Sequence, residues 1–321
     1  MKRVLIISNG HGEDLIAATL IESIREEAPD YRIMALPIVG LGEAYQKIDV
    51  PLVMPGKTLP SGGFLRNNLR NFFMDLQGGL FGLTWRQIRA LREIRGAVDL
   101  LVCVGDVYLV LLAGWFTVGP IFFLPTAKSD HIAAHWPIEI RMMRSFCKQV
   151  FPRDAKTAES LSEKGLPAKF VGNLMMDALK FQAPDLKSIE DEWTVAILPG
   201  SRREAYLNME DLAKVTLSFR RLVSKKSGEK DLRFLVALSG GLSITEISTR
   251  LAPDGWKETP PSSNEAKTGI IGHLDKPVNG QRLRITVIQG RFADILAASD
   301  IVLGLAGTAS EQAVGLGKPV I

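Results

Sequence analysis

Four short segments, each directly after an apolar run, hold residues that could bind an anion or move a proton. The first, residues 8–14 (SNGHGED), combines two glycines, a histidine and two acids. Glycines let a ligand approach the backbone, and a helix that begins there offers free N–H groups. We therefore expect a substrate-facing loop, with His11 as a candidate general base. The other residues expected at the substrate are Asn9, Gly10, Gly12 and Glu13. The alternative is an ordinary strand-to-helix turn with its acids on the helix dipole.

A dinucleotide-binding loop is disfavoured at this position. The G-x-G-x-x-G fingerprint needs a third glycine, and Leu15 stands there. The next apolar run ends at residues 34–37 (MALP) without the acid that holds a ribose. The sequence therefore predicts no NAD and, more generally, no cofactor.

The second segment is Val104-Gly105-Asp106, at the end of a predicted central strand. Ligands of open α/β sheets bind outside the carboxyl ends of the strands. Asp106 could take a proton from an attacking hydroxyl, or it could cap the following helix. The sequence favours both roles equally.

The third and fourth segments are typical of phosphate-binding loops. Residues 198–204 (LPGSRRE) offer close backbone approach at Gly200, a hydroxyl at Ser201, and two guanidinium groups, Arg202 and Arg203. In residues 304–313 (GLAGTASEQA), small residues end a strand and open a helix that could cradle a diphosphate. The residues expected there are Gly307, Thr308, Ala309, Ser310 and Glu311, the last for ribose hydroxyls. Either loop could be a plain helix start, but together they favour a nucleotide-diphosphate pocket. No P-loop or D-x-D metal motif is present, and we expect no metal.

These segments lie between alternating strand and helix patterns. In the first half we expect strands at residues 4–8, 32–36, 100–104, 121–124, 149–152 and 169–172, with helices between them. Such alternation predicts right-handed βαβ units and a mostly parallel sheet covered on both faces. The charge-free run 107–125 is read as a buried helix and strand rather than a membrane span, because Gly119-Pro120 divides it.

A polar stretch, residues 182–192, interrupts the pattern before the alternation restarts. We expect an α/β fold of two Rossmann-like domains with mostly parallel sheets, residues 1–181 and 193–321. Residues 253–281 are rich in Pro, Ser, Gly and Lys, which predicts a loop-like insertion. Residues 318–321 (KPVI) read as the opening of a buried strand, so we expect the second domain to be incomplete.

The composition and the net charge exclude several classes of protein. The 321 residues are 46% hydrophobic and 23% charged, which indicates a globular protein. Two cysteines exclude a disulfide framework and favour a reducing, cytoplasmic compartment. The net charge of +4 is too small for a nucleic-acid coat but suits an anionic ligand or membrane surface.

Together these residues resemble lipid A disaccharide synthases and related proteins of the GT-B glycosyltransferase superfamily. The resemblance rests on ILPGSRREA at residues 197–205 and on ASD at 298–300 followed by AGTA at 306–309. It implies the two-domain GT-B fold, a lipid-like acceptor in the first domain and a UDP-sugar donor in the second. It also implies an inverting, metal-independent transfer, with Asp106 at the position of the family's catalytic aspartate.

Two other functions stay open. Residues 315–320 (GLGKPV) resemble UDP-N-acetylglucosamine 2-epimerases, which share the GT-B fold and would make the protein an isomerase. The third reading is a non-catalytic relative that binds a nucleotide sugar or a lipid.

Residues 59–83 form an apolar stripe with phenylalanines and basic neighbours. Between Lys57 and Arg95 there are seven basic and two acidic residues. A basic amphipathic helix lies in the interface of anionic membranes, so we expect this segment to dock on the inner membrane face. Core packing of an amphipathic helix explains the stripe equally well.

Overall fold

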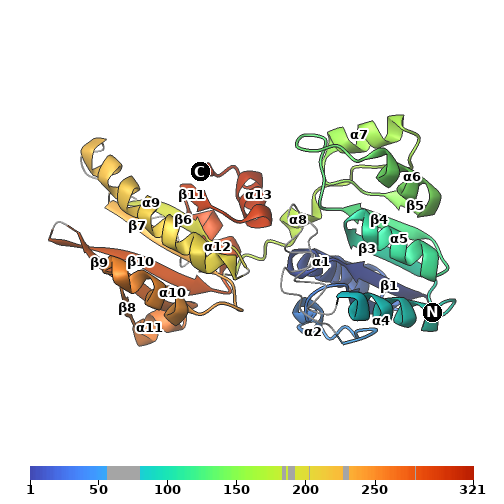
Figure 1. The fold of residues 1–321 in the computed structure, drawn as a ribbon, viewed down its shortest axis with the longest axis horizontal. Coiled ribbons are helices and arrows are strands. Elements are labelled where there is room, and N and C mark those ends of the chain that lie inside the picture. The colour runs from blue at the N-terminus through green and yellow to red at the C-terminus, as the bar shows by residue number, and fades with distance from the viewer. Residues whose placement is uncertain (56–79, 183–185, 187–191, 202, 227–230, 279) are drawn as a thin grey trace. The chain divides into compact units, whose positions relative to one another are not determined.

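The computed structural model describes residues 1–55, 80–182, 186, 192–201, 203–226, 231–278 and 280–321. Contacts within the chain divide it into two compact units, Met1–Ala178 (unit 1) and Leu179–Ile321 (unit 2). Each unit is an α/β structure with its own sheet (Figure 1).

Unit 1 is built on a five-stranded parallel sheet in the order β2-β1-β3-β4-β5. Its strands are β1 (Arg3–Ser8), β2 (Arg32–Pro37), β3 (Leu100–Gly105), β4 (Ile121–Pro125) and β5 (Cys147–Val150). Its helices are α1 (His11–Glu27), α2 (Glu43–Gln46), α4 (Leu80–Glu93), α5 (Val107–Phe116), α6 (Pro137–Phe146), α7 (Ala155–Glu163) and α8 (Leu174–Asp177). The parallel sheet with crossover helices is the arrangement that the strand-helix alternation predicts.

The strands of unit 1 are buried on both faces, which explains their continuous apolar runs. Leu5 and Ile7 of β1 pack in the cluster that includes α5 and α6, whereas Val4 and Ile6 pack against α1. The charge-free run 107–125 forms α5 and β4, as predicted. None of the helices in the described part of the chain is long and apolar enough to cross a membrane.

The register of this sheet brings three chain segments to one edge. Ser8 pairs with Val104, and Gly105 pairs with Pro125. The residues that follow β1, β3 and β4 therefore begin next to one another at the carboxyl ends of the strands, where open α/β sheets bind their ligands.

Unit 2 contains a six-stranded mixed sheet in the order β11-β6-β7-β10-β9-β8. Its strands are β6 (Glu192–Leu198), β7 (Asp231–Leu238), β8 (Lys257–Thr259), β9 (Ile270–Val278), β10 (Gln281–Gln289) and β11 (Ile301–Gly304). Its helices are α9 (Glu204–Lys226), α10 (Ile244–Leu251), α11 (Ser263–Ala266), α12 (Phe292–Ala298) and α13 (Gly307–Gly315), with a 3-10 turn at Ala252–Asp254.

Two sequence expectations are wrong. Residues 253–281 are not a loop-like insertion, because they contain β8, α11 and β9 and extend the sheet with antiparallel strands. Residues 169–172 form no strand. The chain there makes an isolated bridge from Ala168 to Val150, and the Lys169 amide donates to the Val150 carbonyl.

Candidate functional site

Asp106 lies at the sheet edge of unit 1 and uses both carboxylate oxygens. Oδ1 accepts the Tyr108 amide at 2.9 Å and caps α5, and Oδ2 accepts Nδ2 of Asn9 at 2.7 Å. Burial raises the pKa of Asp106 above its usual range, and the bonds from Asn9 and Tyr108 limit that rise. The side chain is thus both a helix cap and a carboxyl group with increased proton affinity.

Gly105 makes the contact between Asn9 and Asp106 possible. Its φ of +146° is unfavourable for residues with a side chain, and a Cβ there would lie 2.6 Å from Oδ1 of Asn9. The glycine therefore lets the end of β1 and the end of β3 approach each other. This places Asn9 and Asp106, both predicted from the sequence, in one cluster.

The first loop contains a buried hydrogen-bonded chain that the sequence did not single out. The Tyr45 hydroxyl lies 2.5 Å from Oγ of Ser8, which donates at 2.5 Å to Oδ1 of Asp14. Because the single Ser8 proton goes to Asp14, the Tyr45 hydroxyl is the donor to Ser8. All three residues are buried, and Oδ2 of Asp14 has no hydrogen-bond partner within the described residues. Burial raises the pKa of Asp14 to about 7.

The remaining residues of this loop begin α1. Gly10 is its N-cap, His11 its first residue, and Gly12 lies in the first turn. Glu13 receives a bond from the Thr126 hydroxyl at 3.4 Å, which links the first loop to the end of β4. Asn9, Glu13 and Asp106 are therefore held at the same sheet edge, whereas for His11 only the backbone position is described.

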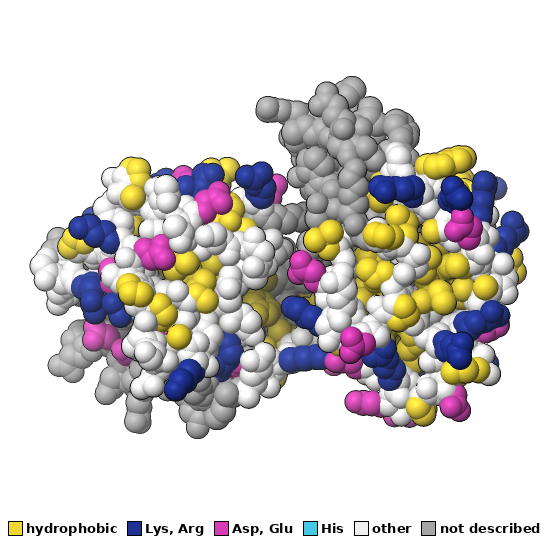
Figure 2. Space-filling view, turned by 90° about the horizontal axis from the view of Figure 1, so that it is seen from below, with side chains coloured by type: hydrophobic (Ala, Val, Ile, Leu, Met, Phe, Trp, Pro, Cys, Tyr) yellow, Lys and Arg dark blue, Asp and Glu magenta, His cyan; other side chains and the backbone are white. Residues whose placement is uncertain are grey.

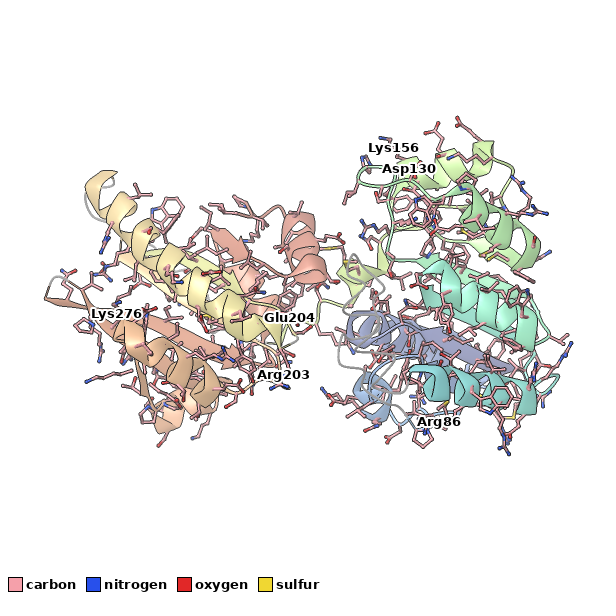
Figure 3. The ribbon with its side chains drawn as sticks, in the orientation of Figure 1. Arg86, Asp130, Lys156, Arg203, Glu204 and Lys276 are labelled. Atoms are coloured by element: carbon pink, nitrogen blue, oxygen red, sulfur yellow. The ribbon has the colours of Figure 1, made fainter. Side chains whose placement is uncertain are left out.

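The loop after β4 is fixed on two sides. The Thr126 amide donates to the Gly105 carbonyl at 3.0 Å, next to Asp106. The Asp130 amide donates to Oγ1 of Thr157 on α7 at 2.9 Å, and Figure 3 labels Asp130 beside Lys156 of the same helix. Between these two contacts, Lys128 donates to Oε2 of Glu139 at 2.7 Å. The sequence gives no signal of this pair, because its two residues stand eleven positions apart in no recognisable motif.

The negative charge of Glu139 acts on the nearby carboxyl group of Asp106. Hydrogen bonds from Lys128 and from the Trp136 amide outweigh partial burial and lower the pKa of Glu139 below its usual range, so it is ionised. Its negative charge contributes to the raised pKa of Asp106. The edge of unit 1 therefore holds two carboxyl groups whose environments push their pKa values apart, a common arrangement for acid-base work.

In unit 2, the two predicted phosphate loops leave neighbouring strands. Gly304 of β11 pairs with Leu198 of β6, and the Leu305 amide donates to the Leu198 carbonyl at 3.1 Å. Gly200, at the turn after β6, has φ +112°, a conformation that favours glycine. The structure therefore brings residues 199–201 and 305–310 to one edge of the sheet, although the two segments lie about a hundred residues apart.

These two loops carry polar groups and a helix start that could bind an anion. Ser201 and Arg203 are exposed, and Figure 3 shows Arg203 and Glu204 at the start of α9; Arg202 lies outside the described residues. Helix α13 begins at Gly307 with Thr308 and Ala309 in its first turn, and its N-cap residue Ala306 gives no side-chain bond. Exposed Gly307 and Thr308 leave the helix start open to a ligand. Ser310 follows with a buried hydroxyl, and Glu311 is exposed.

Unit 1 also contains an apolar pocket of about 300 Å³ on the α1 side of its sheet. Every lining residue is hydrophobic: Leu20, Ile24, Leu100, Val102, Phe122, Leu124, Phe151, Val171 and Leu174. Such a cavity suits a hydrocarbon group and offers nothing to a polar one. Within the described part of the chain, no group of three or more His, Cys, Asp or Glu residues could hold a metal ion.

Curated relatives match about half of this chain in sequence, and solved structures match nearly all of it in fold. A curated lipid-A-disaccharide synthase of Alteromonas mediterranea is 28% identical over 165 residues, which are 49% of this chain and 35% of that protein. One from Thiobacillus denitrificans is 27% identical over 169 residues, 50% of this chain and 36% of that protein. The matched stretches thus span about a third of these curated relatives, and no family model matches.

Solved structures agree on the architecture. The S. aureus MnaA–UDP co-structure covers 100% of this chain and 78% of its own, with a TM-score of 0.58 and 17% identity. A UDP-GlcNAc 2-epimerase from Neisseria meningitidis bound to UDP-GlcNAc covers 99% of this chain and 81% of its own, with a TM-score of 0.55 and 16% identity. The chain is therefore similar in sequence to lipid-A-disaccharide synthases over half of its length, and it has the two-domain, Rossmann-like GT-B fold that its sequence motifs indicated.

Proposed function

We propose that this protein is a glycosyltransferase that moves a sugar from a UDP-sugar, of the UDP-N-acetylglucosamine type, to a lipid-linked acceptor. The observation that carries the proposal is the pair of loops at residues 199–201 and 305–310, which leave hydrogen-bonded neighbouring strands. The sequence similarity to lipid-A-disaccharide synthases supports transfer to a lipid. The apolar pocket of unit 1 supports an acceptor with a hydrocarbon part.

In this proposal, the carboxylate of Asp106 takes the proton of an acceptor hydroxyl as the oxygen attacks C1 of the donor sugar. The bond from C1 to the diphosphate breaks with inversion, and UDP leaves with the electron pair. Arg203, Arg202 and the N–H groups at the start of α13 stabilise the negative charge on the leaving diphosphate. In this proposal the guanidinium groups and the backbone N–H groups supply the positive charge that a metal would otherwise provide.

The donor site gives the first prediction. Arg203→Ala should weaken UDP binding about 10- to 150-fold in isothermal calorimetry, because it removes a charge-assisted hydrogen bond worth about 1.5–3 kcal/mol. The matched control is Lys214→Ala, which removes a cation farther along α9 and should leave UDP affinity unchanged. If neither Arg203→Ala nor Arg202→Ala weakens binding, the donor pocket lies elsewhere.

A UDP-release assay tests the proposed reaction. With UDP-N-acetylglucosamine as donor, we expect UDP to appear only when a lipid-linked acceptor is present. An epimerase would instead isomerise the donor without acceptor, and a non-catalytic relative would bind UDP without turnover. Either result would replace the transferase proposal.

We also propose that the protein works at an anionic membrane surface on the cytoplasmic side. The segment that suggested this, residues 59–83, lies outside the described residues up to position 79. Helix α4, which continues it, carries an exposed Trp85 with Arg86 and Arg89. Figure 2 shows hydrophobic side chains on the surface of unit 1 with Lys and Arg side chains beside them. Membrane docking stays a prediction.

A further inference from the structure

Beside Asp106, the loop after β4 and the start of α6 hold a polar cluster that the proposed transfer does not use. It consists of Lys128, Trp136 and Glu139, with His135 beneath. The cluster lies at the same sheet edge as Asp106, because the Thr126 amide bonds to the carbonyl of Gly105.

Glu139 accepts hydrogen bonds through only one of its carboxylate oxygens, Oε2, within the described part of the chain. Oε2 receives Nζ of Lys128 at 2.7 Å and the Trp136 amide at 2.8 Å, and Nδ1 of His135 lies 3.4 Å from it. Within the described chain every contact of Glu139 goes to Oε2. Oε1 is therefore available to a ligand, on a side chain whose orientation two hydrogen bonds fix.

His135 supports this arrangement from below. It is 8% exposed, and neither ring nitrogen has a hydrogen-bond partner in the described part of the chain. Burial lowers its pKa, so the imidazole is neutral and adds no charge to the cluster. Nδ1 of this ring lies 3.4 Å from Oε2 of Glu139, so the buried imidazole packs against the carboxylate.

Trp136 supplies a flat apolar surface at the same place. The residue is 66% exposed, and Nζ of Lys128 lies 4.1 Å from its ring centroid. An exposed indole, a free carboxylate oxygen and an ammonium group together match a sugar ring. Lys128 covers one face of the indole, so the C–H face of a pyranose would pack on the other face, with hydroxyls at the ring edge donating to the carboxylate and accepting from the ammonium.

The charges at this position favour a sugar over a phosphate as ligand. Lys128 is paired with Glu139, and the carboxyl group of Asp106 lies close enough to feel Glu139. The charges of Lys128 and Glu139 cancel, so this pair offers a phosphate no net attraction, whereas hydroxyl groups find both a donor and an acceptor.

We propose that Trp136, Glu139 and Lys128 form the subsite that holds a sugar ring of the acceptor, with its reacting hydroxyl toward Asp106. The assignment of that ring to the acceptor rests on the proposed function, and the subsite deepens it by naming the residues that recognise the acceptor head group. It does not depend on UDP chemistry, so it can be tested without turnover.

The test is saturation-transfer NMR with methyl β-D-glucopyranoside as probe, in excess UDP so that any donor pocket is filled. We expect the wild-type chain to bind the probe. Trp136→Ala should weaken binding at least tenfold, and Trp136→Phe, which keeps an aromatic face, should retain most of it. Glu139→Gln should weaken binding about tenfold, because a neutral amide accepts sugar hydroxyls less strongly; glutamine still suits the capping position, so the helix is kept.

The matched control is Trp115→Ala. Trp115 is 59% exposed but lies near the end of α5, away from the edge where Asp106 begins that helix. It should bind the probe like wild type. The proposal is overturned if wild type does not bind the probe, if Trp136→Ala binds as well as wild type, or if Trp115→Ala causes the same loss. If UDP turnover is absent but the probe binds through Trp136, the subsite stands and the transferase proposal fails.

Discussion

Asp106→Asn should lower the turnover of glycosyl transfer about 10²- to 10⁴-fold while leaving UDP affinity unchanged. The loss is expected because an amide cannot take the proton of the acceptor hydroxyl. The raised pKa of Asp106 adds a second signature. In the wild type, activity should rise with pH through a carboxyl pKa above the usual range, and that acidic limb should disappear with Asp106.

The variant should fold, which makes the result interpretable. An asparagine oxygen can still accept the Tyr108 amide and cap α5. The new amide can donate to Oδ1 of Asn9, which has no hydrogen-bond partner among the described residues, if the Asn9 carboxamide rotates. Thermal melting provides the control. A folded variant with near-normal turnover would contradict the assignment and move the role of general base to His11 or Glu13.

Asp14→Asn should remove a large pH dependence of stability. Asp14 is 1% exposed, and burial raises its pKa to about 7 from a model-peptide value near 4. The folded state therefore holds a proton that the unfolded state releases. The stability that this proton provides is fully present below about pH 4 and is lost as the pH rises through about 7. The loss amounts to about 3–5 kcal/mol.

Denaturant unfolding of wild type and variant between pH 4 and 8 measures this difference. The two free energies of unfolding should be similar at pH 4, and the variant should be the more stable protein at pH 8. The control is Asp30→Asn, an exposed aspartate in the turn between α1 and β2, whose curve should parallel that of the wild type. Parallel curves for Asp14→Asn would show that the buried carboxyl is ionised throughout this range.

The sequence predicted the parts of the fold that depend on local pattern. Continuous apolar runs such as residues 4–7 identify strands buried on both faces, and the strand-helix alternation identifies the parallel sheet of unit 1. The antiparallel strands β8 and β9 were missed because polar and charged residues break up their pattern. Asn279-Gly280, a strong hairpin signal between β9 and β10, could have identified them.

The candidate site was predictable only where it lies next to a strand end. Asp106 and Asn9 directly follow apolar strands, so their position reveals them. Glu139 and Tyr45 reach the site from helices, through contacts that no spacing rule encodes. The raised pKa of Asp14 likewise depends on its burial, which the tertiary structure sets. Such residues become visible only when the packing around them is known.

The most direct test of the central claim is mass analysis of the acceptor. The protein is incubated with UDP-N-acetylglucosamine and a lipid-linked monosaccharide. Mass spectrometry then gives the mass of the lipid product, and the amount of UDP released is measured in the same sample. We predict that the acceptor gains one N-acetylhexosamine for each UDP, and that Asp106→Asn makes this product far more slowly. UDP-N-acetylglucosamine that is isomerised or left unchanged, with the acceptor mass unaltered, would contradict glycosyl transfer.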